Sequence, residues 1–212
     1  MKNIIVLVSG GGTNLQALIN AQERGEIQNG KITCVISSNP DAYALQRAEH
    51  HGIKSKVLNR KNYPDNQAYT QDLLKLLQEE QADLIVLAGF MIILDKALIQ
   101  AYENKIINVH PSLIPSFCGD GFYGLHVHEK ALEKGVKLTG ATVHFVNEIC
   151  DGGAIILQKA VEIQDDDTPE ILQKRVMEQA EWKILPQAVS LFCQDRLTVM
   201  GNHAYIDYQK GN

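Results

Sequence analysis

The residues best suited to chemistry are Asn108 and His110, which end an apolar stretch and precede Pro111. Side chains two residues apart in a strand lie on the same face. The proline favours an extended backbone at His110, so both side chains should point past the strand end. An amide can stabilise a developing oxyanion, and an imidazole can move a proton near neutral pH. The pair predicts such chemistry; the alternative is a core histidine beside an amide in a turn.

A glycine-rich loop, 9–14, lies between an apolar run and a helix-length segment. Its glycines let the backbone turn tightly and approach an anion, while Thr13, Asn14 and the helix N–H groups can donate hydrogen bonds. No Gly-Lys-Ser/Thr follows, so this is not a Walker loop. Leu15 occupies the third glycine position of a dinucleotide fingerprint, so that motif is incomplete. Both a phosphate site and a plain tight turn remain open.

Asp151 is the best candidate for a carboxylate that holds the imidazole of His110. It lies in the sequence Cys-Asp-Gly-Gly, 150–153, between two β-rich runs. A nearby negative charge favours the protonated imidazole. An Asp-Gly pair is also common in the turns of β-hairpins. The alternative interpretation is therefore that Asp151 only forms the turn.

Short apolar runs alternate with amphipathic segments in the first half of the chain, which indicates an α/β fold with a mostly parallel, twisted sheet and helices on both faces. Such sheets bind ligands at the carboxyl ends of their strands. If the strands ending near 8, 88 and 109 are neighbours, the glycine loop, Gly89 and the Asn108/His110 pair border one cleft.

The expected strands are 3–8, 31–37, 54–58, 84–88 and 105–109, and the expected helices are 14–24, 41–51, 64–80 and 95–102. Thr13, Asp41 and Pro64 occupy expected N-cap or first-turn positions.

The pattern changes after residue 110, where antiparallel additions are expected. A loop over 111–124 leads to a short helix at 126–134 and two β-rich runs, 138–147 and 154–163. A long helix opens at 168–170 and continues towards 192, and 196–206 predicts a hairpin turned at 201–202. With no repeat and no linker, we expect one domain over 1–212, with a phosphate-binding half, 1–110, and a C-terminal half, 111–212.

Composition narrows the class of protein. The chain has 212 residues, and its 45% apolar fraction is typical of a globular protein. Its formal charge of −5 argues against nucleic-acid binding. We expect no signal peptide before the first strand, and the apolar run of that strand is too short to span a membrane. The four cysteines are scattered, as expected for free thiols in a reducing compartment. We therefore expect a cytoplasmic protein that acts on small molecules, either as a monomer or as a homodimer.

Metal catalysis and a cysteine nucleophile are less favoured alternatives. His126 and His128 do not share a helix face and would point to opposite sides of a strand, so they make poor co-ligands. Cys118 and Cys150 are likewise less favoured as nucleophiles. We expect no metal.

Together these segments resemble the glycinamide ribonucleotide formyltransferase family of purine biosynthesis. The matching motifs follow the family's order over nearly the whole chain: SGGGTNLQ at 9–16, LAGFM at 87–91, NVHPSLIP at 108–115, GLHVH at 124–128, VHFV at 143–146 and DGG at 151–153. The resemblance implies a Rossmann-like formyltransferase fold. It also implies formyl transfer from 10-formyltetrahydrofolate, as co-substrate, to the amine of glycinamide ribonucleotide on the way to IMP.

The resemblance also implies roles for individual residues. Asn108, His110 and Asp151 match the family's catalytic trio. The residues matching the phosphate loop are Gly12, Thr13 and Asn14. The folate pocket, which also includes Asn108, matches Met91, Ile92, Ile93, Leu94, Asn147, Glu148, Ile149, Cys150 and Asp151. Glu181 matches a glutamate that holds the glycinamide amine, although its helix carries one extra residue.

Some residues depart from the family pattern. Ile92 and Asn66 stand where the family often has arginines near the folate glutamate carboxylates, so Arg60 or Lys61 is the expected substitute. The stretch 116–123 is longer than the usual loop. These departures affect recognition of the folate tail more than the chemistry.

Three other functions remain open. Two of them are enzymatic, because the Asn-x-His-Pro and Asp motifs occur in several formyl-handling enzymes. Formyltetrahydrofolate hydrolases carry an N-terminal regulatory domain, whereas Met1 here leads directly into a predicted strand. Methionyl-tRNA formyltransferases carry a C-terminal tRNA-binding domain and lack this phosphate loop. A non-catalytic nucleotide-binding module would explain the glycine loop but not the trio.

Overall fold

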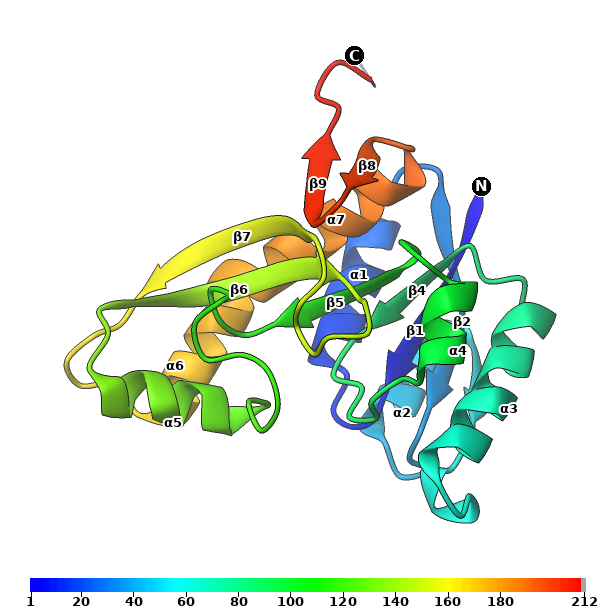
Figure 1. The fold of residues 1–212 in the computed structure, drawn as a ribbon, viewed down its shortest axis with the longest axis horizontal. Coiled ribbons are helices and arrows are strands. Elements are labelled where there is room, and N and C mark those ends of the chain that lie inside the picture. Colours follow the sequence, from blue (N-terminus) through cyan, green and yellow to red (C-terminus); the bar gives the residue numbers. More distant parts are fainter. Residues whose placement is uncertain (211–212) are drawn as a thin grey trace.

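A computed structural model describes residues 1–210, in which nine strands form one sheet (Figure 1). The strands are β1 (Lys2–Val8), β2 (Gly30–Ser37), β3 (Lys54–Val57), β4 (Leu84–Leu87), β5 (Ile106–His110), β6 (Leu138–Phe145), β7 (Ile155–Glu162), β8 (Leu197–Met200) and β9 (His203–Ile206). The helices are α1 (Thr13–Glu23), α2 (Tyr43–His50), α3 (Asn66–Glu79), α4 (Lys96–Ala101), α5 (Leu125–Lys134), α6 (Pro169–Val176) and α7 (Trp182–Cys193). A 3₁₀ turn covers Arg60–Asn62, and a π-helical turn, Met177–Glu181, joins α6 to α7.

The strand order β3-β2-β1-β4-β5-β6-β7-β9-β8 confirms the predicted fold class. All pairs among β1 to β5 are parallel. β6 and β7 continue the sheet in antiparallel fashion, and β8 with β9 forms the predicted C-terminal hairpin, which projects from the body in Figure 1. The chain builds outward from β1 to β3 and then returns to the other side of β1, so the order switches between β1 and β4. Ligand sites in such sheets lie at this switch.

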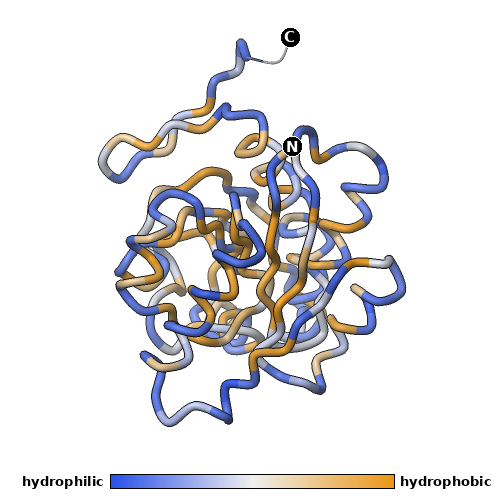
Figure 2. The backbone as a smooth tube through the Cα atoms, turned by 90° about the vertical axis from the view of Figure 1, so that its right-hand side faces the viewer, coloured by the Kyte–Doolittle hydropathy of each residue, from blue (hydrophilic) through white to orange (hydrophobic). Residues whose placement is uncertain are grey.

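The sheet is buried on both faces because its central strands are apolar throughout. Along β1, Ile4 and Val6 pack in one cluster with residues of α1 and α7, whereas Ile5 and Leu7 pack in another with residues of α3 and α4. Figure 2 shows these apolar strands passing through the interior while hydrophilic segments lie outside. Alternation of side chains between two helical layers explains why β1 has no polar face.

Helix starts differ by one or two residues from those expected. α1 begins at Thr13, and its N-cap is Gly12 in the left-handed region rather than a side-chain cap. α3 is capped by Asp65, whose side chain accepts from the N–H of Ala68 at 2.8 Å, so Pro64 precedes the cap. Asp41 likewise precedes Ala42, the N-cap of α2, so these two expected positions were wrong.

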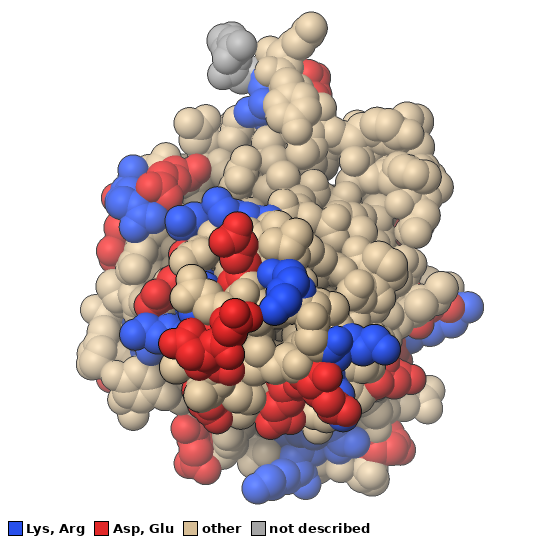
Figure 3. Space-filling model, turned by 90° about the vertical axis from the view of Figure 1, so that its left-hand side faces the viewer, with Lys and Arg blue, Asp and Glu red and all other residues tan. Residues whose placement is uncertain are grey.

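Within residues 1–210, no helix is both long and apolar enough to cross a membrane. On the face in Figure 3, acidic and basic side chains are interspersed, and neither sign forms a continuous stripe.

Candidate active site

The ends of β1, β4 and β5 meet at one edge of the sheet, as the sequence predicted for neighbouring strands. The loop after β1 is bonded to the loop after β4. The N–H of Ser9 donates to the Gly89 carbonyl at 3.1 Å, and the N–H of Met91 donates to Ser9 Oγ at 3.0 Å. The glycine loop, the 89–94 loop and the Asn108/His110 pair therefore surround one region.

Asn108 on β5 lies directly opposite His144 on β6. Asn108 Nδ2 is 3.2 Å from His144 Nε2, and His144 Nδ1 is 2.8 Å from the carbonyl oxygen of its neighbour, Phe145. Because that carbonyl can only accept, Nδ1 carries a proton, and in the neutral ring Nε2 accepts from the Asn108 amide. His144 thus fixes the orientation of the Asn108 amide.

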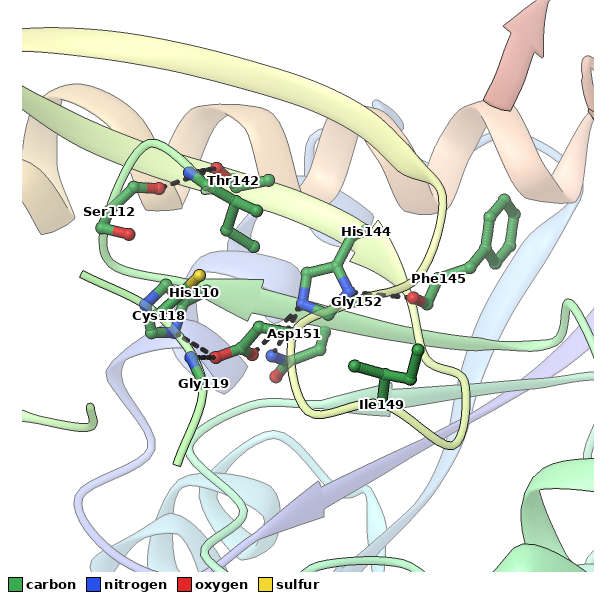
Figure 4. Close-up of polar contacts among 12 residues, drawn as sticks. His110, Ser112, Cys118, Gly119, Thr142, His144, Phe145, Ile149, Asp151 and Gly152 are labelled. Atoms are coloured by element: carbon green, nitrogen blue, oxygen red, sulfur yellow. Dashed lines mark hydrogen bonds and ion pairs between the residues drawn. The ribbon is translucent and has the colours of Figure 1, made fainter. Parts of the chain in front are cut away.

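Asp151 lies between two imidazoles (Figure 4). Its Oδ2 is 3.5 Å from His110 Nδ1, and its Oδ1 is 3.6 Å from His144 Nε2. The N–H of Gly119 also donates to Oδ2 at 2.9 Å. On the other side of the His110 ring, Nε2 is 2.8 Å from the Phe117 carbonyl oxygen. His110 therefore has an acceptor near each nitrogen, an arrangement that suits the protonated ring.

Burial opposes this preference. His110 is only 4% exposed, and desolvation lowers its pKa below the ordinary value. Asp151 and the Phe117 carbonyl push the pKa upward, and His144 pushes it down. The sequence predicted that Asp151 raises the His110 pKa; its contribution has that sign, but the net shift is downward because burial outweighs it.

The pKa of Asp151 itself is lowered. Desolvation raises it, but the adjacent His144 ring, the hydrogen bond from the N–H of Gly119 and the nearby His110 together outweigh burial. Asp151 is therefore held as a carboxylate, with His110 Nδ1 3.5 Å from one of its oxygens.

The phosphate-loop candidates lie at the start of α1. Asn14 Nδ2 donates to Glu181 Oε2 at 2.7 Å, which joins the loop to the π-helical turn 167 residues later in the chain. Thr13 Oγ1 lies 3.6 Å from Met177 Sδ in the same turn. Glu181 is buried, and burial raises the pKa of its carboxyl to about 7, with the Asn14 bond acting in the opposite direction. The structure thus brings Asn14 and Glu181 together beside the glycine loop.

The folate-site candidates divide into exposed and buried side chains. Met91, Ile93 and Ile149 are exposed apolar groups, whereas the Leu94 side chain is buried in the core and does not face a ligand. The 147–151 turn is held internally, because the N–H of Ile149 donates to Asn147 Oδ1 at 3.0 Å and Asn147 Nδ2 donates to the Gly152 carbonyl at 3.2 Å. Glu148 forms an ion pair with Lys96, in which Oε2 lies 3.2 Å from Nζ. Cys150 is exposed. These two segments offer apolar side chains and fixed backbone around the region of Asn108.

The two positions that depart from the family pattern are neighbours in space. Asn66 Nδ2 donates to the Ile93 carbonyl at 2.6 Å, and Ile92 packs in part against the core cluster under α3 and α4. Arg60 is tied to the Tyr63 carbonyl at 3.0 Å, which limits its reach. Lys61 is exposed.

The histidines do not assemble a metal centre in the part of the chain that the structure describes, where no group of three or more metal-binding side chains is found. His126 is exposed, and its Nδ1 lies 3.0 Å from Glu129 Oε2. His128 is buried in α5.

Sequence reasoning missed three contributors to the site: the His144 ring, the Phe117 carbonyl and the Gly119 N–H. His144 left a usable signal, because with Thr142 it forms an alternating polar pair inside an apolar strand. The two backbone groups left none, since every residue carries them.

Comparisons with known proteins find relatives that match nearly the whole chain. The family model described as "Formyl transferase" matches residues 2–189. Phosphoribosylglycinamide formyltransferase of Haemophilus influenzae is 44% identical over 98% of this chain and 94% of its own length. The crystal structure of glycinamide ribonucleotide transformylase 1 from Symbiobacterium toebii superposes with a TM-score of 0.91, at 41% identity, over 97% of this chain and 94% of that one. A formyltetrahydrofolate deformylase from Pseudomonas syringae has a TM-score of 0.86 at 29% identity, and this chain covers only 65% of it. The chain therefore belongs to the formyl transferase family, alongside relatives named phosphoribosylglycinamide formyltransferase.

Proposed function

We propose that this protein transfers the formyl group of 10-formyltetrahydrofolate to the amine of glycinamide ribonucleotide. The observation that carries the proposal is the placement of Asn108, His110 and Asp151 beside a glycine loop at the helix start of α1. An oxyanion donor and a proton-transfer group next to an anion site suit acyl transfer to a phosphorylated amine. Full-length similarity to phosphoribosylglycinamide formyltransferases supports this substrate.

The reaction begins with attack of the uncharged amine on the formyl carbon. The new C–N bond forms as the carbonyl electron pair moves to oxygen, and the Asn108 amide donates a hydrogen bond to that oxyanion. The tetrahedral intermediate then breaks its bond to N10 of the folate. His110 protonates N10, and Asp151 takes up the proton lost by the amine, which yields tetrahydrofolate and the formylated ribonucleotide.

The charge on His110 changes during this sequence. Burial lowers its pKa in the unliganded protein. A developing oxyanion adds a second negative charge beside Asp151 and favours the protonated ring. His110 is therefore most readily protonated when the intermediate forms, and as a buried acid it gives up the proton readily to N10. Its contact with the Phe117 carbonyl has to be exchanged for one with the substrate.

The two substrates approach from different sides of Asn108. The phosphate binds at Gly12, Thr13 and Asn14, and Glu181 holds the glycinamide end through its carboxyl group. The folate lies against the 91–94 and 147–151 segments, whose exposed apolar side chains suit a planar ring. We infer a cytoplasmic enzyme that needs no metal and works as a monomer or a homodimer.

An acceptor competition tests this proposal. Purified protein with 10-formyltetrahydrofolate is offered glycinamide ribonucleotide, water alone or charged initiator tRNA, and release of tetrahydrofolate is followed with product identification. We expect formyl transfer to the ribonucleotide at a rate far above hydrolysis. Hydrolysis that the ribonucleotide does not accelerate would favour a deformylase, and ribonucleotide binding without turnover would favour a non-catalytic module.

A further inference from the structure

The glycine loop is fastened to α2 through its carbonyl groups. The N–H of Ala44 donates to the Gly10 carbonyl at 3.1 Å, and Arg47 Nε donates to the Gly11 carbonyl at 2.8 Å. Gly12 has φ 70°, and a Cβ at this position would lie 2.6 Å from that of Ala44. The loop therefore packs against α2 without room for a side chain.

Holding these carbonyls also aims the loop's N–H groups. In a trans peptide the C=O and the following N–H point in opposite directions. The bonds to Gly10 and Gly11 thus turn the N–H groups of Gly11 and Gly12 away from α2. Over residues 1–210 neither N–H has a partner within the protein, and both precede the unpaired N–H groups of the first turn of α1. Consecutive free N–H groups at a helix start form an anion site.

Arg47 is itself held in one orientation. Its Nη1 donates to Gln16 Oε1 on α1 at 3.0 Å, and its guanidinium carbon lies 4.9 Å from the centre of the Tyr43 ring. Arg47 and Thr13 line the same surface groove, of about 330 Å³. The planar guanidinium bonds the loop and α1 at once, in a fork that an ammonium group cannot reproduce.

We propose that Arg47 is a positioning residue for phosphate binding: it acts through the Gly11 peptide, which it holds so that the loop's N–H groups face the phosphate. The proposal rests on the proposed function only for the identity of the phosphorylated ligand. Arg47→Gln should raise the KM for glycinamide ribonucleotide about tenfold, the cost of one charge-assisted hydrogen bond, with kcat and the folate KM within twofold of wild type. Arg47→Lys should behave like Arg47→Gln, because it keeps the charge but loses the fork.

The test compares binding of glycinamide ribonucleotide with binding of its dephosphorylated riboside by calorimetry, apart from turnover. Both Arg47 variants should weaken ribonucleotide binding and leave riboside binding unchanged. Arg24→Gln is the matched control, since Arg24 lines the same groove but pairs with Glu26 at 2.6 Å; it should bind both ligands as wild type does.

Wild-type affinity in Arg47→Lys would show that charge alone matters and would overturn the proposal. Equal weakening of ribonucleotide and riboside, with or without a lower Tm, would show general structural support and would also overturn it. If the wild-type protein binds the ribonucleotide with the expected dependence on Arg47 but transfers no formyl group, the proposed function fails while the role of Arg47 stands.

Discussion

Replacing Glu181 by glutamine should change how the stability of the protein depends on pH. Glu181 is 6% exposed, and burial raises the pKa of its carboxyl from 4.5 to about 7. Between these values the folded protein keeps a proton that the unfolded chain has released. The stability due to this proton is fully present below pH 4.5 and is lost as the pH rises through 7. The pKa difference corresponds to a total loss of about 3 kcal/mol.

Glutamine keeps an oxygen that accepts from Asn14 but does not titrate. The free energy of unfolding of Glu181→Gln minus that of wild type should therefore increase by about 2–3 kcal/mol between pH 5 and pH 8. Urea denaturation at both pH values measures this difference, and the other titrating groups cancel because the two proteins share them. Glu178→Gln removes an exposed carboxylate from the same turn and should give a nearly constant difference. A constant difference for Glu181→Gln, or one that falls as the pH rises, would refute the reasoning.

Three further changes test the proposed site. Asn108→Ala removes the oxyanion donor and should lower kcat by about 10²–10³ while substrate dissociation constants change little; near-wild-type turnover would exclude this role. Asp151→Asn removes the charge 3.5 Å from His110 Nδ1 and should lower the His110 pKa further, as followed by NMR titration of the ring; an unchanged or higher pKa would contradict the assigned contribution. Ile92→Arg should tighten calorimetric binding of folates that carry glutamate but not of analogues truncated before it, through a new carboxylate pair; an equal effect on both would show that Ile92 does not face the tail.

Patterns within single strands and helices predicted the fold well. The alternation of short apolar runs with amphipathic segments was enough for the parallel sheet, because strands covered by helices on both faces must be apolar throughout. The spacing of Asn108 and His110 similarly placed two side chains on one face. The single-domain expectation stays a prediction, although one sheet includes strands from both halves of the chain.

Contacts between distant segments could not be predicted in the same way. That His144 faces Asn108 depends on the register of β6 against β5, which no local pattern encodes. The sequence showed the carboxylate that raises the His110 pKa but not the burial that lowers it. Family resemblance pointed to Glu181, yet its contact with Asn14 depends on the π-helical turn that holds it, which the sequence did not predict.

The π-helical turn at Met177–Glu181 holds one residue more than a regular α-helical path between α6 and α7 would need. In an α-helix each inserted residue rotates everything after it by about 100°, so an insertion would turn one of the two flanking helices away from the sheet. A π turn confines the added residue to a local bulge, and Leu172 of α6 and Leu185 of α7 both remain buried. A one-residue deletion in this turn would restore a regular helix and rotate the Glu181 carboxyl away from Asn14. Under the proposed function, a change of one residue in the length of this turn would alter the contact with the glycinamide end while leaving the core unchanged.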